Sequence, residues 1–192
     1  MPMSPDFAAQ RAVMVESQVR VADVTDYGIQ DAMRLVARES LLPADKAYLA
    51  YADVEAPYAP GRWLLKPRDV AKLLQAIRPR AGERALAIAA PYAAAVLEAM
   101  GLAVARRDEG DLAAPSPRFD VVICEGAVSE VPRAWCEALE VPNGRLGVVV
   151  RQGPVGRAKV YVPADGGFGA LDVFDCSPPF MAGFEPKPAF AF

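Results

Sequence analysis

Histidine is absent from the 192-residue sequence. Histidine is the side chain that most often moves protons near neutral pH, and it belongs to Ser-His-Asp and Cys-His catalytic groups and to many zinc sites. Its absence excludes all of these arrangements. Any acid–base chemistry in this protein would depend on Asp, Glu, Tyr, Lys or Cys.

Cysteine is scarce as well. The three cysteines, Cys124, Cys136 and Cys176, are odd in number and widely spaced. A disulfide framework needs paired cysteines and a metal cage needs closely spaced ligands. We therefore expect reduced thiols, as in a cytoplasmic protein, and no metal centre.

The chain has no excess of positive charge: Lys and Arg total 21 against 24 Asp and Glu, a formal charge of −3. Proteins that bind nucleic acid place clustered Lys and Arg against the phosphates, so we expect no nucleic-acid partner. No apolar run is long enough to span a bilayer, and the opening MPMSPDFAAQR lacks the basic and apolar regions of a signal peptide. These absences predict no membrane span and a soluble, cytoplasmic protein.

What the sequence does contain is enough apolar side chain for a sizeable core, with 53% hydrophobic and 23% charged residues. Residues 6–38 show two helical patterns separated by RVADVTDYG, which predicts an N-terminal helical arm. Residues 41–63 are rich in Pro, Tyr and Ala and only weakly periodic. They predict a short helix or two followed by an extended loop.

From residue 67 on, apolar strands alternate with helices. Strands are expected at residues 85–89, 102–106, 119–124, 145–150, 158–162 and 171–174, and helices at 67–77, 92–100 and 131–140. This alternation predicts an α/β fold, in which an open, mostly parallel sheet is covered on both faces and ends in an antiparallel C-terminal hairpin. We predict a single domain over residues 1–192, with the arm and loop in 1–66 and the α/β core in 67–192.

One long segment has a more specific pattern. Residues 119–150, FDVVICEGAVSEVPRAWCEALEVPNGRLGVVV, contain an FD-V-x-V-x-x-A-x-x-x-x-P phrase, then a helix, then an N-G-x-L strand. This order resembles the protein-L-isoaspartate O-methyltransferase family of S-adenosylmethionine-dependent enzymes. The likeness extends to MVESQVRVADVTDYGIQDAM in the arm, to RWLLKPRDVAKLLQAI and to VFDCSPPFMAGF near the end. It implies a Rossmann-like methyltransferase fold, with S-adenosylmethionine as the cofactor if the protein is active.

The resemblance implies a cofactor site in the segment RALAIAAPYAAAVLEAMG. The family carries an acidic residue near the end of this strand and a G-x-G-x-G turn after it. Here the acidic position falls on Ala87 and the glycine positions fall on Ala89, Ala90 and Pro91. An alanine in the left-handed conformation costs roughly 1–2 kcal/mol, and proline lacks an N–H donor. We therefore expect cofactor binding to be lost.

Three further residues belong to the implied cofactor site. Tyr92 either stacks on an adenine or, as we favour, fills the volume that the cofactor would take. Asp108 or Glu109 either holds the ribose hydroxyls or lies in a solvated turn. The short segment RDEGDLAAPSPR before residue 119 leaves no room for a strand and a helix, so the sheet is expected to be reduced at one edge. Either the third strand is missing, or DEGDL ends the third strand and the second is missing.

On the substrate side, the family's T-x-S-Q-P segment reads RWLLKP here, with Leu65 at the serine position. Glu125 follows the strand at 119–124, at the carboxyl end where open α/β sheets place functional residues. It is the candidate catalytic residue if it lines a remnant pocket, although we favour a turn that it forms with Gly126. Cys124 is expected to be a small buried side chain.

The losses in the turn, at the sheet edge and at Leu65 predict a methyltransferase-fold protein with a degenerate site. We expect it to be a binding or structural module without cofactor binding or activity. A protein partner would contact the aromatic region at 48–65, which holds Tyr48, Tyr51, Tyr58 and Trp63, unless these side chains pack over the sheet. The alternative is an active S-adenosylmethionine-dependent protein carboxyl O-methyltransferase with an unusual cofactor turn.

Overall fold

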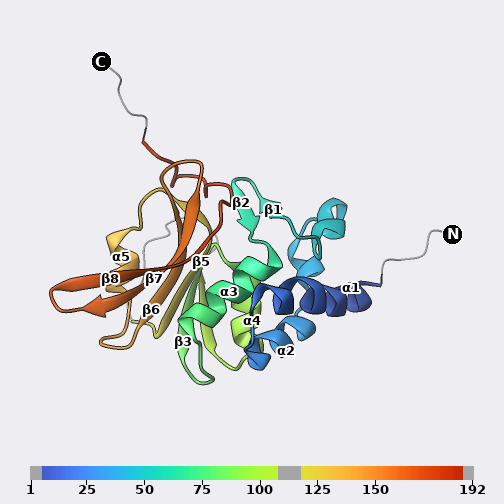
Figure 1. Ribbon diagram of the computed structural model, residues 1–192, viewed down its shortest axis with the longest axis horizontal. Coiled ribbons are helices and arrows are strands. Elements are labelled where there is room, and N and C mark those ends of the chain that lie inside the picture. The colour runs from blue at the N-terminus through green and yellow to red at the C-terminus, as the bar shows by residue number, and fades with distance from the viewer. Residues whose placement is uncertain (1–5, 108–117, 188–192) are drawn as a thin grey trace, which may run out of the picture.

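The computed structural model describes residues 6–107 and 118–187 (Figure 1). Its main sheet has the strand order β4-β3-β5-β6-β7-β8. The strands are β3 (Arg84–Ile88), β4 (Ala103–Arg107), β5 (Val121–Val128), β6 (Arg145–Arg151), β7 (Gly156–Ala164) and β8 (Gly167–Asp175). Neighbours from β4 to β6 are parallel, whereas β7 is antiparallel to both β6 and β8. The predicted Rossmann-like open sheet with an antiparallel C-terminal hairpin is confirmed.

The strand β4 forms one edge of this sheet. It pairs with β3 from Arg84↔Ala103 to Ile88↔Arg107, and no strand within the described residues pairs with its other side. The reduced edge is therefore present in the described part of the chain. Either alternative leaves one strand beside β3, which is where the structure has β4. The segment DEGDL lies outside the described residues.

Helices cover both faces of the sheet. They are α1 (Phe7–Met14), η1 (Val15–Val19), η2 (Arg20–Ala22), α2 (Tyr27–Leu35), η3 (Arg38–Leu41), η4 (Ala44–Leu49), α3 (Pro67–Ile77), α4 (Pro91–Ala99) and α5 (Arg133–Glu137). The arm, α3 and α4 bury their apolar side chains against one face, in a cluster that includes Val121 and Val149. The other face carries α5 (Figure 1), and Trp135 of this helix belongs to a second buried cluster. None of the described helices combines the length and the apolar character needed to cross a bilayer.

Three elements differ from the prediction. Strand β5 continues to Val128, so Glu125 lies inside a strand. Helix α5 is shorter than the predicted 131–140, because Leu139 leaves the helix to form a bridge with Phe119. The predicted extended loop ends in a two-stranded hairpin of β1 (Ala56–Ala59) and β2 (Arg62–Leu64).

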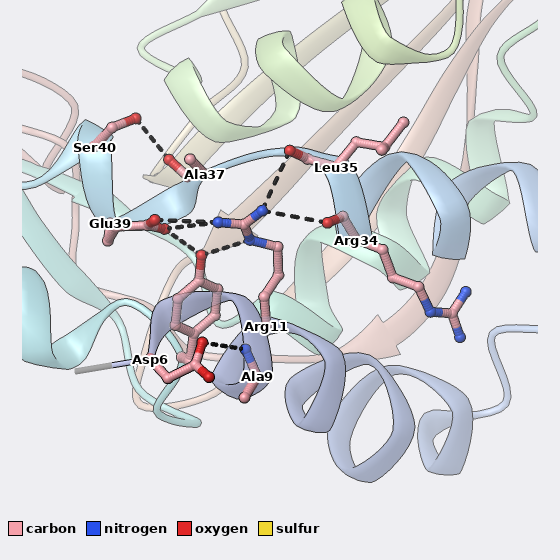
Figure 2. A network of polar contacts seen from close by, with 9 residues as sticks. Asp6, Ala9, Arg11, Arg34, Leu35, Ala37, Glu39 and Ser40 are labelled. Carbon is pink, nitrogen blue, oxygen red and sulfur yellow. Dashed lines mark hydrogen bonds and ion pairs between the residues drawn. The ribbon is translucent and has the colours of Figure 1, made fainter. Parts of the chain in front are cut away.

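The arm is held in place by Arg11 of α1 (Figure 2). Its guanidinium donates to the Tyr51 hydroxyl at 2.9 Å and to the Glu39 carboxylate at 3.1 Å. It also donates to the backbone carbonyls of Arg34 and Leu35, at the end of α2. One arginine therefore joins α1 to α2 and to the turns that follow α2.

Candidate functional site

The candidate site lies where the carboxyl end of β3 turns into α4. Open α/β sheets bind their ligands outside the carboxyl ends of the strands, and the predicted cofactor residues Ala87, Ala89, Ala90 and Tyr92 all come from this turn. All four side chains are fully buried. The turn is therefore packed against the rest of the protein and does not line an open cleft.

The backbone of the turn is unusual at Ala89, which has φ +45°. A left-handed conformation costs an alanine roughly 1–2 kcal/mol. The Ala89 N–H donates to the carbonyl of Arg107 at 2.8 Å, a contact with the neighbouring strand that helps to hold this conformation. Ala90, by contrast, has φ −131°. Of the three positions where glycines were expected, only Ala89 needs the conformational freedom of glycine.

Glu125 reaches this turn from the middle of β5. The register between β5 and β6 shifts between Ile123 and Ala127, which is a bulge in β5. The side chain of Glu125 is 1% exposed. The Ala93 N–H donates to its Oε1 at 2.6 Å, and the Leu65 N–H donates to its Oε2 at 3.1 Å. The expected turn with Gly126 is wrong, and the two carboxylate oxygens face backbone N–H groups of the chain itself.

Glu125 also caps helix α4. Pro91 occupies the start of the helix, and no side chain at the N-cap position, Ala90, accepts a hydrogen bond. The first N–H groups of a helix have no partner within the helix, and Glu125 satisfies that of Ala93. The Glu125 carboxylate, which comes from β5, therefore replaces the acceptor that a Ser, Thr or Asp side chain usually supplies at the N-cap position.

Leu65 takes part through its backbone. Its side chain is buried. Its N–H donates to Glu125, and its carbonyl accepts from Nη2 of Arg38 at 2.7 Å. In the sequence, Leu65 is notable only because it replaces a serine. Its backbone hydrogen bonds could not be predicted, because a sequence pattern reports side chains alone.

Arg38 completes the site, and no pattern in the sequence pointed to it. Its guanidinium is fully buried, lies 4.4 Å from the ring centroid of Tyr92 and donates from Nε to the carbonyl of Ala50 at 2.8 Å. Neither Nη1 of Arg38 nor the Tyr92 hydroxyl has a hydrogen-bond partner in the structure. A cation stacked on an aromatic face is stabilised by the ring electrons, so Tyr92 supports the buried charge of Arg38.

Burial dominates the electrostatics of this site. It raises the pKa of Glu125 to about 7, while the positive charge of Arg38 and the N–H groups of Ala93 and Leu65 act in the opposite direction. Burial also lowers the pKa of Arg38 and raises that of Tyr92. Desolvation disfavours the charged form of each group. The site is therefore a buried cluster of titratable side chains.

The remaining predicted residues lie elsewhere. Cys124 is fully buried as expected, with its Sγ 4.0 Å from the sulfur of Met181, and burial raises its thiol pKa. Within residues 6–107 and 118–187, no three Cys, Asp or Glu side chains are grouped so that they could hold a metal ion. Asp108 and Glu109 lie outside the described residues.

The aromatic region at 48–65 divides into exposed and packed side chains. Tyr48 is 71% exposed, whereas Tyr51 is buried beneath α1. Tyr58 and Trp63 line a hollow of about 370 Å³ together with residues of the β1–β2 turn and of η4. This hollow lies on a different part of the molecule from the α4 turn, because the two share no residue.

Comparison with the sequences of known proteins identifies relatives. No family model matches the chain. A protein-L-isoaspartate O-methyltransferase of Methylorubrum populi is 36% identical over 176 residues, which cover 77% of this chain and 82% of that protein. This chain belongs to the protein-L-isoaspartate O-methyltransferase family. The Methylorubrum extorquens enzyme of the same name is 33% identical over 180 residues, covering 79% of this chain and 78% of that protein.

Solved structures of this family share the fold. A Plasmodium falciparum protein described as a protein-L-isoaspartate O-methyltransferase, in complex with S-adenosyl-L-homocysteine, superposes with a TM-score of 0.72 at 15% identity, covering 89% of this chain and 97% of that one. The resemblance drawn from the sequence pattern is confirmed at the level of family and fold.

The described residues of the α4 turn differ from the cofactor-binding pattern that the resemblance implies. The position expected to be acidic is Ala87, which offers no hydrogen-bonding side chain, and it is fully buried. The N-terminus of α4 is bonded to Glu125, and Tyr92 fills the space beside Arg38.

Proposed function

We propose that this member of the protein-L-isoaspartate O-methyltransferase family does not bind S-adenosylmethionine and acts as a binding or structural module. The observation that carries the proposal is the Glu125 carboxylate, which occupies the N-terminus of α4 at 2.6 Å from the Ala93 nitrogen. The chain thus keeps the methyltransferase fold, while its own side chains fill the place where a ligand would bind.

A ligand at the N-terminus of α4 would have to break hydrogen bonds that the protein already makes there. To reach the N-terminus of α4, it must displace Glu125 and so end the hydrogen bonds from Ala93 and Leu65. A hydrogen bond to a charged group contributes about 1.5–3 kcal/mol, and each 1.4 kcal/mol changes a dissociation constant about tenfold. The loss of both bonds would weaken a micromolar ligand to roughly millimolar or beyond.

The aromatic region at 48–65 is the surface that we propose for a protein partner. Tyr48 is largely exposed, and Trp63 and Tyr58 border the hollow beside the β1–β2 turn. Aromatic side chains with exposed faces are frequent in protein interfaces because they bury a large area at a low entropy cost.

The alternative is an active S-adenosylmethionine-dependent protein carboxyl O-methyltransferase. The names of the relatives at 36% and 33% identity favour it. In that case the N–H groups of Ala89 and Ala90 would contact the cofactor, Asp108 or Glu109 would hold the ribose, and Glu125 would turn toward the substrate.

Titration of the purified protein with S-adenosylmethionine and S-adenosylhomocysteine tests the proposal. Thermal unfolding and calorimetry are followed up to about millimolar ligand, with the Methylorubrum populi relative as the control that should bind. The proposal predicts no shift of the melting temperature for this chain. Micromolar binding, or transfer of a radiolabelled methyl group to an isoaspartyl peptide above a boiled control, would establish the alternative.

A further inference from the structure

We propose that the N-terminus of α4, the Leu65 N–H and the Arg38 guanidinium together form a carboxylate-binding site, and that the side chain of Glu125 is its resident ligand. This inference goes beyond the proposed function, because it concerns the ligand chemistry of the site and holds whether or not the cofactor binds.

The donor set selects a carboxylate. Both oxygens of Glu125 accept backbone N–H groups, one from Ala93 and one from Leu65. A carboxylate accepts through both oxygens, whereas an amide presents one acceptor and one donor. The N-terminal end of α4 carries the positive pole of the helix dipole, which favours a negative group at this position.

The second observation is the buried charge of Arg38. Among the residues that the structure describes, its Nη1 has no hydrogen-bond partner, and its Nε and Nη2 are bonded only to neutral backbone carbonyls. It attracts Glu125 electrostatically. An isolated buried cation is very costly, so the carboxylate of Glu125 balances a charge that the fold has placed beside the helix N-terminus.

The site joins segments that are far apart in the sequence. Leu65 follows the β1–β2 hairpin, Ala93 lies in α4 and Glu125 lies in β5. The resident carboxylate therefore connects the N-terminal region with two elements of the α/β core. Removal of the Glu125 side chain is expected to weaken the connection between these segments and so lower the stability of the protein. A free carboxylate of the right size is expected to restore that stability.

The variant Glu125→Ala creates a matching vacancy. The atoms removed are Cγ, Cδ and both Oε, which correspond to an acetate ion. The full chain carrying Glu125→Ala is unfolded thermally at about pH 8, where acetate is ionised, with acetate, acetamide or chloride at constant ionic strength. We expect acetate alone to raise the melting temperature saturably, by roughly 3–6 °C when its concentration is about tenfold above its dissociation constant.

The wild-type chain and Glu125→Gln are the matched controls. Their side chains fill the space, so acetate should not change their melting temperatures beyond the chloride control. A response of Glu125→Ala to acetate that is no larger than its response to acetamide or chloride would overturn the proposal.

A second measurement covers the case in which Glu125→Ala does not fold in plain buffer. The variant is refolded from urea with acetate or acetamide, and the native near-ultraviolet circular dichroism is recorded. Recovery with acetate alone supports the proposal, and equal recovery, or none with either additive, contradicts it. The cofactor titration uses the wild-type chain, so its outcome is independent of this one.

Discussion

Two clusters, each of one arginine, one tyrosine and one glutamate, involve the N-terminal region, and they differ in burial. The arm cluster consists of Arg11, Tyr51 and Glu39 (Figure 2). The side chains of Arg11 and Glu39 are 14% and 17% exposed, and all three polar groups bond to one another.

The core cluster consists of Arg38, Tyr92 and Glu125, all buried. Here the three side chains do not bond to one another in pairs. Arg38 stacks on the Tyr92 ring and donates to backbone carbonyls, while Glu125 accepts from backbone N–H groups. The same residue types thus form a side-chain network near the surface and separate backbone contacts in the interior.

The difference follows from solvation. Near the surface, water compensates any polar atom that lacks a partner, and ion pairs contribute little to stability. In the interior, the loss of one charged partner leaves the other charge without compensation. The core cluster should therefore be far more sensitive to substitution than the arm cluster.

The largest expected effect is that of Arg38→Met. It leaves the Glu125 carboxylate buried without its counter-charge, and we expect the free energy of unfolding to fall by about 3–5 kcal/mol. Arg11→Met in the arm cluster should cost about 1–2 kcal/mol. Urea denaturation measures both. Equal losses would show that burial does not distinguish the clusters, whereas the double variant Arg38→Met, Glu125→Gln should recover part of the larger loss.

The next largest effect is the pH dependence of stability. The pKa of Glu125 is about 7 in the folded protein against 4.5 for the free side chain. The folded state therefore binds more protons between these values, so the free energy of unfolding should fall as the pH rises from about 4.5 to about 7, by on the order of 3 kcal/mol. The groups that face this carboxyl are Arg38, Tyr92 and the N–H groups of Leu65 and Ala93.

The measurement compares the wild type with Glu125→Gln by urea denaturation across this pH range. Asp69, whose pKa burial raises to about 6, adds a dependence of the same sign in both proteins, which cancels in the difference. Identical slopes for the two proteins would mean that Glu125 does not titrate in this window.

The smallest effect distinguishes the two tyrosines. The Tyr51 hydroxyl bonds to Arg11 and Glu39, so Tyr51→Phe should cost about 1–2 kcal/mol. The buried Tyr92 hydroxyl has no hydrogen-bond partner within residues 6–107 and 118–187, so Tyr92→Phe should be neutral or stabilise the protein by up to about 1 kcal/mol. Thermal unfolding of both variants tests this contrast, and a clear loss for Tyr92→Phe would reveal a partner for that hydroxyl.

The regular elements of the core could be predicted because their patterns are local. The apolar face of α3 and the apolar runs of β3 and β6 are visible within a few residues of sequence, and their predicted bounds agree closely with the structure. The family pattern at 119–150 is equally local.

The candidate site could not be predicted in the same way, because its contacts cross long distances in the chain. A glutamate followed by glycine after an apolar run is typical of a turn, yet β5 continues through a bulge. The Glu125 side chain accepts N–H groups of Ala93 and Leu65, which lie 32 and 60 residues away. Arg38 is equally hidden, since nothing in the sequence around it distinguishes it from an arginine at the surface.

The hydrogen bonds from Leu65 and Ala93 to Glu125 have a consequence for synthesis on the ribosome. The chain emerges from its N-terminus, so Arg38, Leu65 and the start of α4 are all made before Glu125. Until β5 appears, the buried guanidinium has no counter-charge and the helix has no cap. The docking of the N-terminal region onto the nascent sheet must therefore wait for a residue in the second half of the protein, and arrest peptides placed before and after β5 should register different pulling forces.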